Sequence, residues 1–273
     1  MRKSLFEKIK EEKINYLEEI LATQSLINND YYFKEYISQE FQCSNYRFAF
    51  PCYDDARNYI IDFESFQFQN ALTYYQNNQY NSKYNKWKIK LDVFLDYIEF
   101  YRTLCIDNTK KLHNTIALTQ LIDMLNFNAE KLGYALIFDE KDKVYKAMLK
   151  NPEAEAVALS VKKSTREKIY DYLIIRKGKV SEKRECLKSL ADDVELLCDK
   201  YDVKDFNKVK EFIQCIRHTK DDKNLQKKFP FYYKNEEKWL DNSFKMMIGT
   251  LTYKDVKDIV KEIKELQTNT GGE

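Results

Sequence analysis

The sequence predicts a mainly α-helical protein, a multi-helix bundle-like fold with one β-hairpin near the middle. Glycine and proline are scarce, with 5 and 3 residues among 273, whereas sandwiches and barrels need many glycine-rich turns. Apolar residues recur every three or four positions through most of the chain, which is the helical period. Hydrophobic residues make up 44% of the chain, enough for a sizeable core.

The first half is expected to form helices with aromatic faces. Their predicted ranges are 4–24, 31–42, about 54–72, 87–103 and 109–132. Asp30 is a candidate N-cap of the second helix, and Asp54 or Asp55 of the third. Residues 73–86 are rich in Tyr, Asn and Gln. They form either an aromatic surface that stacks on bases or packs on a partner, or a polar loop with half-buried tyrosines.

The period changes after Gly133, which is expected to end the helix before it. Residues 134–138 are β-prone and residues 139–142 form a polar turn. Tyr145, Ala147 and Leu149 then alternate with lysines, as in a half-buried strand. A β-hairpin is therefore predicted over about 134–149.

The second half returns to helices. Asn151 and Pro152 suit an N-cap and the first helical position, and Ser164 or Thr165 is a candidate cap for the next helix. The following helices are predicted at 166–176, 181–201, 205–217, after Asn235, and at 253–267, with a packed loop at FPFYY. The hairpin is the candidate boundary between an aromatic-rich region, 1–132, and a Lys-rich region, 133–273, unless the chain is one domain.

Composition limits the function classes. A net charge of +2 excludes a polybasic nucleic-acid protein, so a nucleic-acid site has to be a local patch. The charged N-terminus contains no secretory signal, and no apolar run reaches about 18 residues. Six cysteines without a C-x-x-C pair and two distant histidines give no zinc spacing. We expect reduced cysteines, a cytoplasmic location, no membrane partner, and no metal or other cofactor.

The strongest local feature is Arg217 followed by His218. Only eight of the 46 basic residues are Arg. Arg217 continues the apolar stripe of the predicted helix, so its guanidinium needs a carboxylate, a helix C-terminus or a phosphate as partner. In one interpretation Arg217 binds a scissile phosphate and His218 transfers a proton. In the other, two cationic side chains stabilise a helix C-terminus.

Other catalytic motifs are absent from the sequence. It contains no phosphate-binding glycine loop, no G-x-S-x-G elbow and no H-E-x-x-H. Cys215 lies three residues before His218 and is interpreted as a packing residue.

From about residue 121 onward the sequence resembles a group of poorly characterised bacterial proteins of similar length. The resemblance lies in LNFNAEKLGYALIFDEKDKVYKAMLKNPEAEAVA, EKRECLKSLADDVELL, IQCIRHTKDDKN and EEKWLDNSFKMMIGTL. In that group a hairpin is followed by helices and an "IRHN"-like motif. The helical ending is similar to the HEPN superfamily of metal-independent ribonucleases. In the usual HEPN motif an Arg and a polar residue precede a His by several residues. Arg217 matches the Arg and His218 the polar position, and no His follows.

The resemblance implies a bacterial defence effector of the abortive-infection or toxin kind. It would cleave RNA as a homodimer, with Arg217 and His218 as catalytic residues and with RNA contacts from Lys220, Lys223 and Asn224. The alternative is a non-catalytic, partner-binding or regulatory helical protein of a defence or toxin–antitoxin system. Arg217 would then form a structural ion pair, and Arg217→Ala should lower the stability of the fold, because breaking a buried pair costs about 3–5 kcal/mol.

Overall fold

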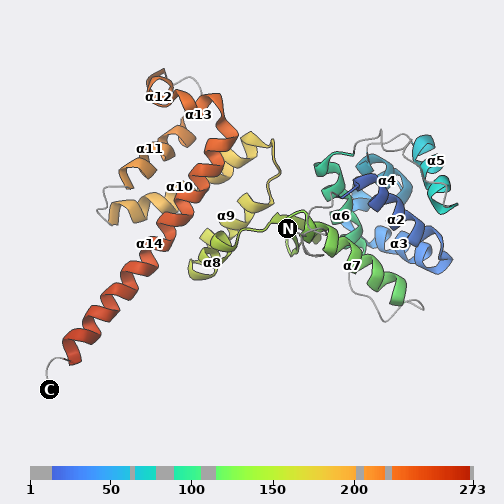
Figure 1. Cartoon of the computed structure of the whole chain (residues 1–273), viewed down its shortest axis with the longest axis horizontal. Coiled ribbons are helices and arrows are strands. Elements are labelled where there is room, and N and C mark those ends of the chain that lie inside the picture. The colour runs from blue at the N-terminus through green and yellow to red at the C-terminus, as the bar shows by residue number, and fades with distance from the viewer. Residues whose placement is uncertain are drawn as a thin grey trace, which may run out of the picture. The chain divides into compact units, whose positions relative to one another are not determined.

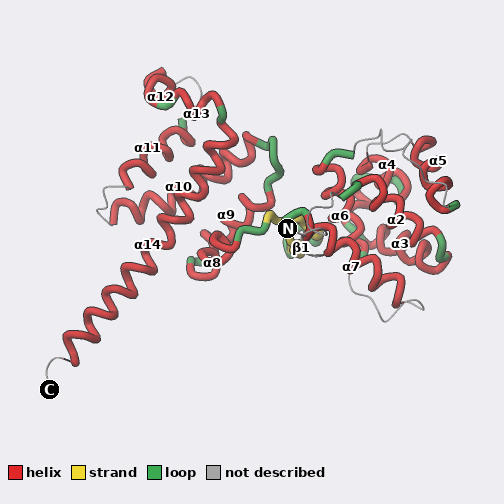
Figure 2. The backbone as a smooth tube through the Cα atoms, in the orientation of Figure 1, coloured by secondary structure: helices red, strands yellow, loops and turns green. Residues whose placement is uncertain are grey.

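The computed structural model describes residues 14–61, 65–77, 89–105, 115–200, 206–218 and 223–270, and of residues 65–68, 115 and 254–270 the backbone alone. Helices dominate these residues, and two strands form one antiparallel hairpin (Figures 1 and 2). The predicted class, mainly α with one hairpin near the middle, is confirmed. Two compact units make up the chain, Met1–Leu149 and Lys150–Glu273.

The first unit is built around one buried helix, α6. Its elements are α2 (Tyr16–Asn28), α3 (Tyr31–Cys43), the 3-10 helix η1 (Asn45–Phe48), α4 (Tyr53–Ile61), α5 (Ser65–Gln76), α6 (Leu91–Leu104), α7 (Thr115–Lys131), β1 (Tyr134–Asp139) and β2 (Val144–Leu149). Eight of the fourteen residues of α6 are buried, and α2, α3, α4 and α7 all contact it. Such a helix is apolar on most sides because it lies inside the core rather than on its surface.

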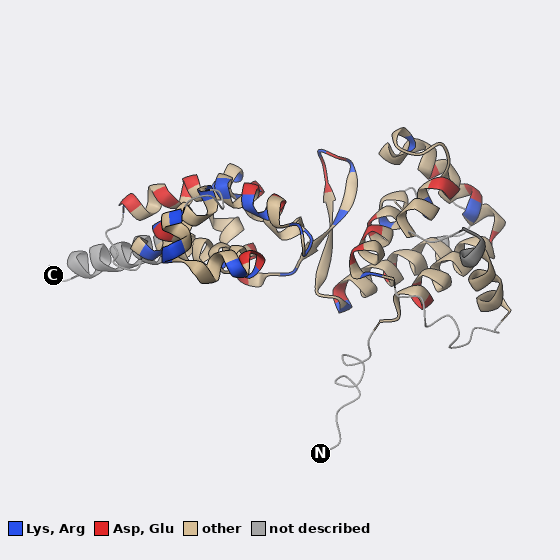
Figure 3. Cartoon of the chain, turned by 90° about the horizontal axis from the view of Figure 1, so that it is seen from above, with Lys and Arg blue, Asp and Glu red and all other residues tan. Residues whose placement is uncertain are grey.

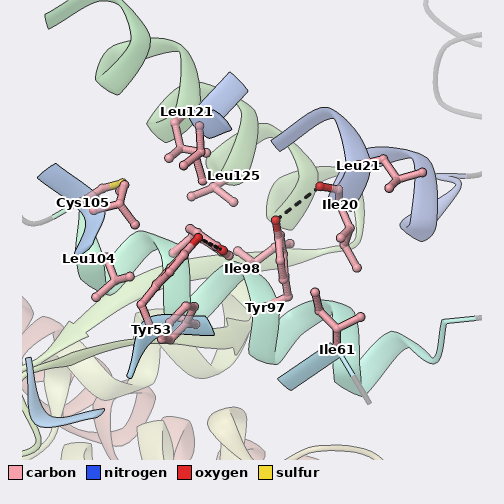
Figure 4. Packing of buried hydrophobic residues seen from close by; sticks show 14 of the residues in the cluster. Ile20, Leu21, Tyr53, Ile61, Tyr97, Ile98, Leu104, Cys105, Leu121 and Leu125 are labelled. Atoms are coloured by element: carbon pink, nitrogen blue, oxygen red, sulfur yellow. Dashed lines mark hydrogen bonds between the residues drawn. The ribbon is translucent and has the colours of Figure 1, made fainter. Parts of the chain in front are cut away.

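Hydroxyl groups are buried with the apolar side chains of this core (Figure 4). The Gln24 side-chain amide donates to the hydroxyls of Tyr97, at 2.9 Å, and Tyr101, at 2.5 Å. The hydroxyls of Tyr53 and Tyr101 are 2.5 Å apart. Burial raises the pKa of Tyr97 and of Tyr101. The three hydroxyls and the Gln24 amide nitrogen are therefore neutral and hydrogen-bonded to one another, which limits the free-energy cost of removing them from water, whereas Gln24 Oε1 has no hydrogen-bond partner among the described residues.

Side chains of α6 fix the hairpin. Tyr134 pairs with Leu149 and Asp139 with Val144. The backbone N–H of Tyr145 donates to Thr103 Oγ1, at 2.8 Å, and that of Ala147 donates to Glu99 Oε1, at 2.5 Å. Two donors on the outer edge of β2 are thus satisfied by a helix, which also covers the edge against pairing with another strand.

These hydrogen bonds explain where the two units divide. The sequence suggested a boundary between residues 132 and 133, before the hairpin. The compact units divide after Leu149, because the hairpin packs on α6 and α7 of the first unit. Patterning marks the change from helix to strand, but it does not say which helix the strand packs against.

Within the described residues the second unit contains helices and no strand, and it is centred on α10. Its elements are α8 (Pro152–Ser160), α9 (Lys163–Ile174), α10 (Val180–Lys200), α11 (Phe206–Arg217), α12 (Lys223–Lys228), α13 (Pro230–Lys234) and α14 (Glu236–Thr270). α9, α11 and α14 all pack on α10 (Figure 1). Aromatic stacking joins α14 to its neighbours, with ring centroids 4.1 Å apart for Tyr172 and Phe244 and 5.5 Å apart for Phe212 and Trp239.

Several predicted helix ends are confirmed. Asp30 caps α3 by accepting from Phe33 N at 3.1 Å. Asn151 caps α8 with Pro152 in the first turn. Gly133 has a φ of 85°, the left-handed conformation that glycine adopts without strain after a helix.

Two predicted caps are wrong. Asp54 and Asp55 lie inside the first turn of α4, which begins at Tyr53. α9 begins at Lys163, before the predicted cap Ser164 or Thr165. The Thr165 hydroxyl instead donates to Asp193 on α10 at 2.9 Å. A tertiary hydrogen bond here replaces the local one.

Three element predictions in the second unit also change. The predicted FPFYY loop is the short helix α13, since Pro230 fits a first helical turn. Lys223–Lys228, which lies between the predicted helices, is α12. The two predicted final helices are one, α14, whose Thr250 and Thr252 hydroxyls bond to carbonyls four residues back. Short breaks in apolar period do not end a helix unless a cap or a proline stops it.

Candidate functional site

α11 presents the Arg217–His218 pair at its C-terminal end. Phe206, Val209, Ile213 and Ile216 are buried on one face of the helix, as their spacing predicts. Arg217 lies next to this face and leaves 30% of its side chain exposed. The guanidinium is therefore at the edge of the core, where it can reach neighbouring helices.

The Arg217 guanidinium is bound by two carboxylates of α10. Nη1 donates to Glu195 and Nη2 to Asp192, each at 2.7 Å. Burial lowers the pKa of Arg217, and the hydrogen bonds that its guanidinium donates to Glu195 and Asp192 outweigh that effect, so the pKa lies above its usual value. Asp192 itself is 70% exposed, which places this ion-pair cluster at the surface.

A second arginine holds the backbone at the same helix end. Arg184 of α10 donates through Nη1 to the carbonyl of His218 at 3.0 Å and to that of Ile216 at 3.4 Å. Its Nε donates to Glu236 Oε1, in the first turn of α14, at 3.0 Å. The side chains of Arg184 and Glu236 are only 12% and 10% exposed. Arg184 thus satisfies carbonyls that the end of α11 leaves without an intrahelical partner.

Lys183, the residue before Arg184, is the centre of an adjoining ionic network. Its Nζ binds Asp241 at 2.8 Å and Glu237 at 3.1 Å. The Tyr172 hydroxyl donates to Asp241 at 2.7 Å, and the backbone N–H of Gly178 donates to Glu237 at 2.6 Å. The Gly178 hydrogen bond, more than the Lys183 pair, lowers the pKa of Glu237. Together these contacts join α9, α10 and α14.

The other predicted site residues are not gathered around Arg217 by any described contact. His218 is exposed, its backbone N–H donates to Gln214, and among the described residues its imidazole has no hydrogen-bond partner. Lys223 and Asn224 are exposed at the start of α12. Lys220 lies outside the described residues, as does the other histidine, His113.

The residues that sequence reasoning missed are the partners of this helix end. Arg184 and Glu236 are far from Arg217 in the chain, and neither stands in a motif. Asp192, an ion-pair partner of Arg217, stands in no motif either. A charged residue inside an otherwise apolar stripe, such as Lys183 on α10, is the signal that could have pointed to a buried ionic network.

Acidic and basic residues both occur on the described helices of the second unit (Figure 3). Within the described residues, no group of three or more His, Cys, Asp or Glu side chains is placed to hold a metal ion. No helix in that part of the chain combines the length and apolar character needed to span a membrane. Among the cysteines, Cys105, Cys198 and Cys215 are buried.

Comparison of the chain with protein-family models, curated proteins and solved structures gave no match.

Proposed function

We propose that this chain is a non-catalytic helical binding protein that acts as a partner-binding or regulatory component of a bacterial defence or toxin–antitoxin system. One observation carries the proposal: the Arg217 guanidinium is already bound by Asp192 and Glu195. The bacterial defence setting is supported by the resemblance of the chain from about residue 121 to a group of bacterial proteins, and by the similarity of its helical ending to the HEPN superfamily.

Charge explains why this arrangement suits a structural role better than phosphate binding. One guanidinium and two carboxylates sum to a net charge of −1 at the site. A phosphate about 4 Å from either carboxylate would meet a repulsion of about 4 kcal/mol at an effective dielectric constant of about 20. Nη1 and Nη2, the nitrogens that would bind a phosphate, already donate to the Glu195 and Asp192 carboxylates. RNA would have to displace these carboxylates.

Exposed aromatic side chains of the first unit support partner binding. Tyr31 and Tyr32 are both exposed at the start of α3 and contact each other edge to face. Phe48 and Tyr59 are exposed as well, and the Arg47 guanidinium lies 4.7 Å from the Phe48 ring centre. Aromatic residues and arginine supply much of the binding energy at protein interfaces.

The experiment compares wild type with Arg217→Ala and His218→Ala, purified and incubated with labelled single-stranded and hairpin RNA in EDTA. We expect no RNA shortening by any of the three proteins. Circular dichroism establishes that both variants fold. RNA fragments that appear with wild type and vanish with Arg217→Ala would overturn the proposal.

The second candidate function is metal-independent RNA cleavage of the HEPN kind. It is favoured by the exposure of His218, whose imidazole is unpartnered among the described residues. In this candidate Arg217 exchanges its carboxylates for phosphate, His218 transfers a proton, and Lys220, Lys223 and Asn224 contact RNA. Induced expression in a bacterial host then stops growth and fragments RNA, and Arg217→Ala/His218→Ala abolishes both effects. Normal growth and intact RNA with wild type support the binding protein.

A further inference from the structure

The hairpin of the first unit has one strand edge that its own packing leaves open, the outer edge of β1. In β2 the backbone N–H groups of Tyr145 and Ala147 point away from β1, because they donate to side chains of α6. Across the hairpin these two residues face Phe138 and Leu136. In an antiparallel pair, residues that face each other turn their backbone groups either both inward or both outward. Leu136 and Phe138 therefore present their N–H and C=O groups at the outer edge of β1.

Among the described residues, no backbone hydrogen bond from outside the hairpin reaches Leu136 or Phe138. The strand, YALIFD, also lacks the lysine, proline or bulge that protects many strand edges, and its register with β2 is unbroken. No residue of β1 is buried, whereas Ala147 and Met148 of β2 are. The hairpin thus has one edge covered by α6, that of β2, and one accessible edge, that of β1.

The chemistry of this edge selects an extended strand as its occupant. Its donors and acceptors lie in one row at the spacing of a β-ladder, which suits the backbone of another strand rather than a helix or a small molecule. Leu136 and Phe138 together offer two donors and two acceptors. A fitting strand has to offer the same number at the same spacing.

A second copy of β1 meets this requirement. If Leu136 faces the partner's Phe138 across a two-fold axis, then Phe138 faces the partner's Leu136, and all of these backbone groups are paired in both copies. Ile137 then lies on the axis, opposite the partner's Ile137. Such a pair of β-branched side chains is favourable in a sheet.

The charges of the strand also favour a copy of itself over a charged peptide. Asp139 is the charged residue of β1, and its carboxylate accepts a hydrogen bond from Lys146 at 2.5 Å. β1 therefore has no unpaired charge with which to recognise a charged segment. In the two-fold register Asp139 faces the partner's Ala135, so no like charges lie opposite each other. The edge fits an uncharged strand, and the central residues of β1 form one.

We propose that the chain forms a homodimer through β1, in which two hairpins join into one four-stranded antiparallel sheet. The strand order is β2, β1, β1 of the second copy and β2 of the second copy. Backbone hydrogen bonds between Leu136 of each copy and Phe138 of the other hold the centre of the sheet. One short strand pair buries less surface than a standard interface, so the dimer is a weak one. This inference does not depend on the function proposed for Arg217, and either one can fail without the other.

Sedimentation equilibrium of the full chain tests for the dimer. The protein is examined from about 1 µM to about 300 µM, a range that covers weak complexes. We expect the mean mass to rise reversibly from that of one chain towards that of two and no further, because pairing uses up both open edges. A single-chain mass at every concentration, or growth beyond two chains, would overturn the proposal.

Cysteine substitutions test the register, in a chain whose exposed Cys43 and Cys52 are replaced by Ser. Ile137→Cys places two thiols opposite each other at a pair with Cα atoms about 4.5 Å apart, which suits a disulfide. The matched control, Ala135→Cys, is on the same face of the same strand, but the two positions are about 13 Å apart along the paired strands. We expect mild oxidation to link Ile137→Cys at least tenfold faster than Ala135→Cys. Equal rates would reject this register.

A charge exchange at the two-fold axis separates loss of the interface from loss of the fold. Ile137→Lys and Ile137→Glu each place two like charges opposite each other in a homodimer, and each should weaken self-association at least tenfold. In an equimolar mixture a lysine faces a glutamate, and we expect the dimer to return. A misfolded hairpin would not recover on mixing. Single variants that associate as tightly as wild type, or a mixture that associates no more than either variant alone, would overturn the proposal.

Discussion

The first unit buries a neutral hydrogen-bond network around α6, beside the charged side chain of Arg57, whereas the buried network around α10 in the second unit is itself charged. Gln24 and three tyrosine hydroxyls form the first set. Lys183 and Arg184, with carboxylates from α14, form the second. The comparison shows two ways of keeping polar groups inside helical packing. Loss of one partner from a neutral network leaves a dipole without a partner, but loss of one from a charged network leaves an ion.

The largest expected effect comes from Arg184→Ala. It removes the hydrogen bonds that Arg184 donates to the Glu236 carboxylate and to two helix-end carbonyls, which should lower the free energy of unfolding by about 3–5 kcal/mol. The loss of stability is measured by urea unfolding. The signal is Trp239 fluorescence, with Trp87 replaced by Phe.

The control for that variant lies on the same helix. Lys188 pairs with Glu185 at the surface, so Lys188→Ala should lower stability by at most about 1 kcal/mol. Similar losses for the two variants would refute a special role for the charged network.

Tyr101→Phe tests the neutral network and should cost about 1–3 kcal/mol, because Tyr53 and Gln24 both lose a partner. Hydrogen exchange read by mass spectrometry should show the loss in peptides from α2, α4 and α6. Tyr59→Phe, which removes an exposed hydroxyl, is the control with no expected change. Faster exchange confined to α10 and α14 would contradict the assignment.

The charged network should lose stability as the pH falls, and the neutral network should not. Because the pKa of Glu237 is lowered in the folded state, its contribution to stability is present above its ordinary value of 4.5 and is lost as the pH falls below it. The tyrosines around α6 have raised pKa values and stay neutral throughout this range. We expect the urea midpoint reported by Trp239 to fall between pH 6 and pH 3.5.

Glu237→Gln is the matched variant for the acid experiment. The glutamine side chain does not take up a proton as the pH falls. The urea midpoint of this variant should therefore depend less on pH than that of wild type. An equal acid dependence would assign the effect to other carboxylates.

The smallest expected effect is that of Arg217→Ala. Its ion pairs lie at the surface, unlike that of Arg184, so the loss should be about 0.2–1 kcal/mol rather than the 3–5 kcal/mol of a buried pair. The same unfolding assay compares the two arginine variants at one helix end. If Arg217→Ala lost as much stability as Arg184→Ala, the different burial of the two arginines would not explain their contributions to stability.

The sequence predicted contacts between residues that are close in the chain and missed contacts between residues that are far apart in it. Asp30, Asn151 and Gly133 act within a few residues of themselves, and their predicted roles are confirmed. The buried stripe of α11 also follows from its spacing. Thr165 was wrongly predicted as a cap, because its partner is 28 positions away.

The candidate site shows the same limit. Sequence identified Arg217 as a side chain in need of a partner and left open a carboxylate, a helix end or a phosphate. Asp192 and Glu195 supply that partner, from positions 25 and 22 residues earlier. Arg184 drew no attention in the sequence because a single arginine on a charged helix has no local signature.

The sequence by itself determined the helical class, the position of the hairpin and the apolar faces, since these depend on residue spacing and on caps a few positions apart. Only the tertiary structure decided which unit holds the hairpin, that Arg184 is more buried than Arg217, and which carboxylates neutralise Arg217. Each of these depends on contacts between helices, and contact energies between charges change severalfold with burial.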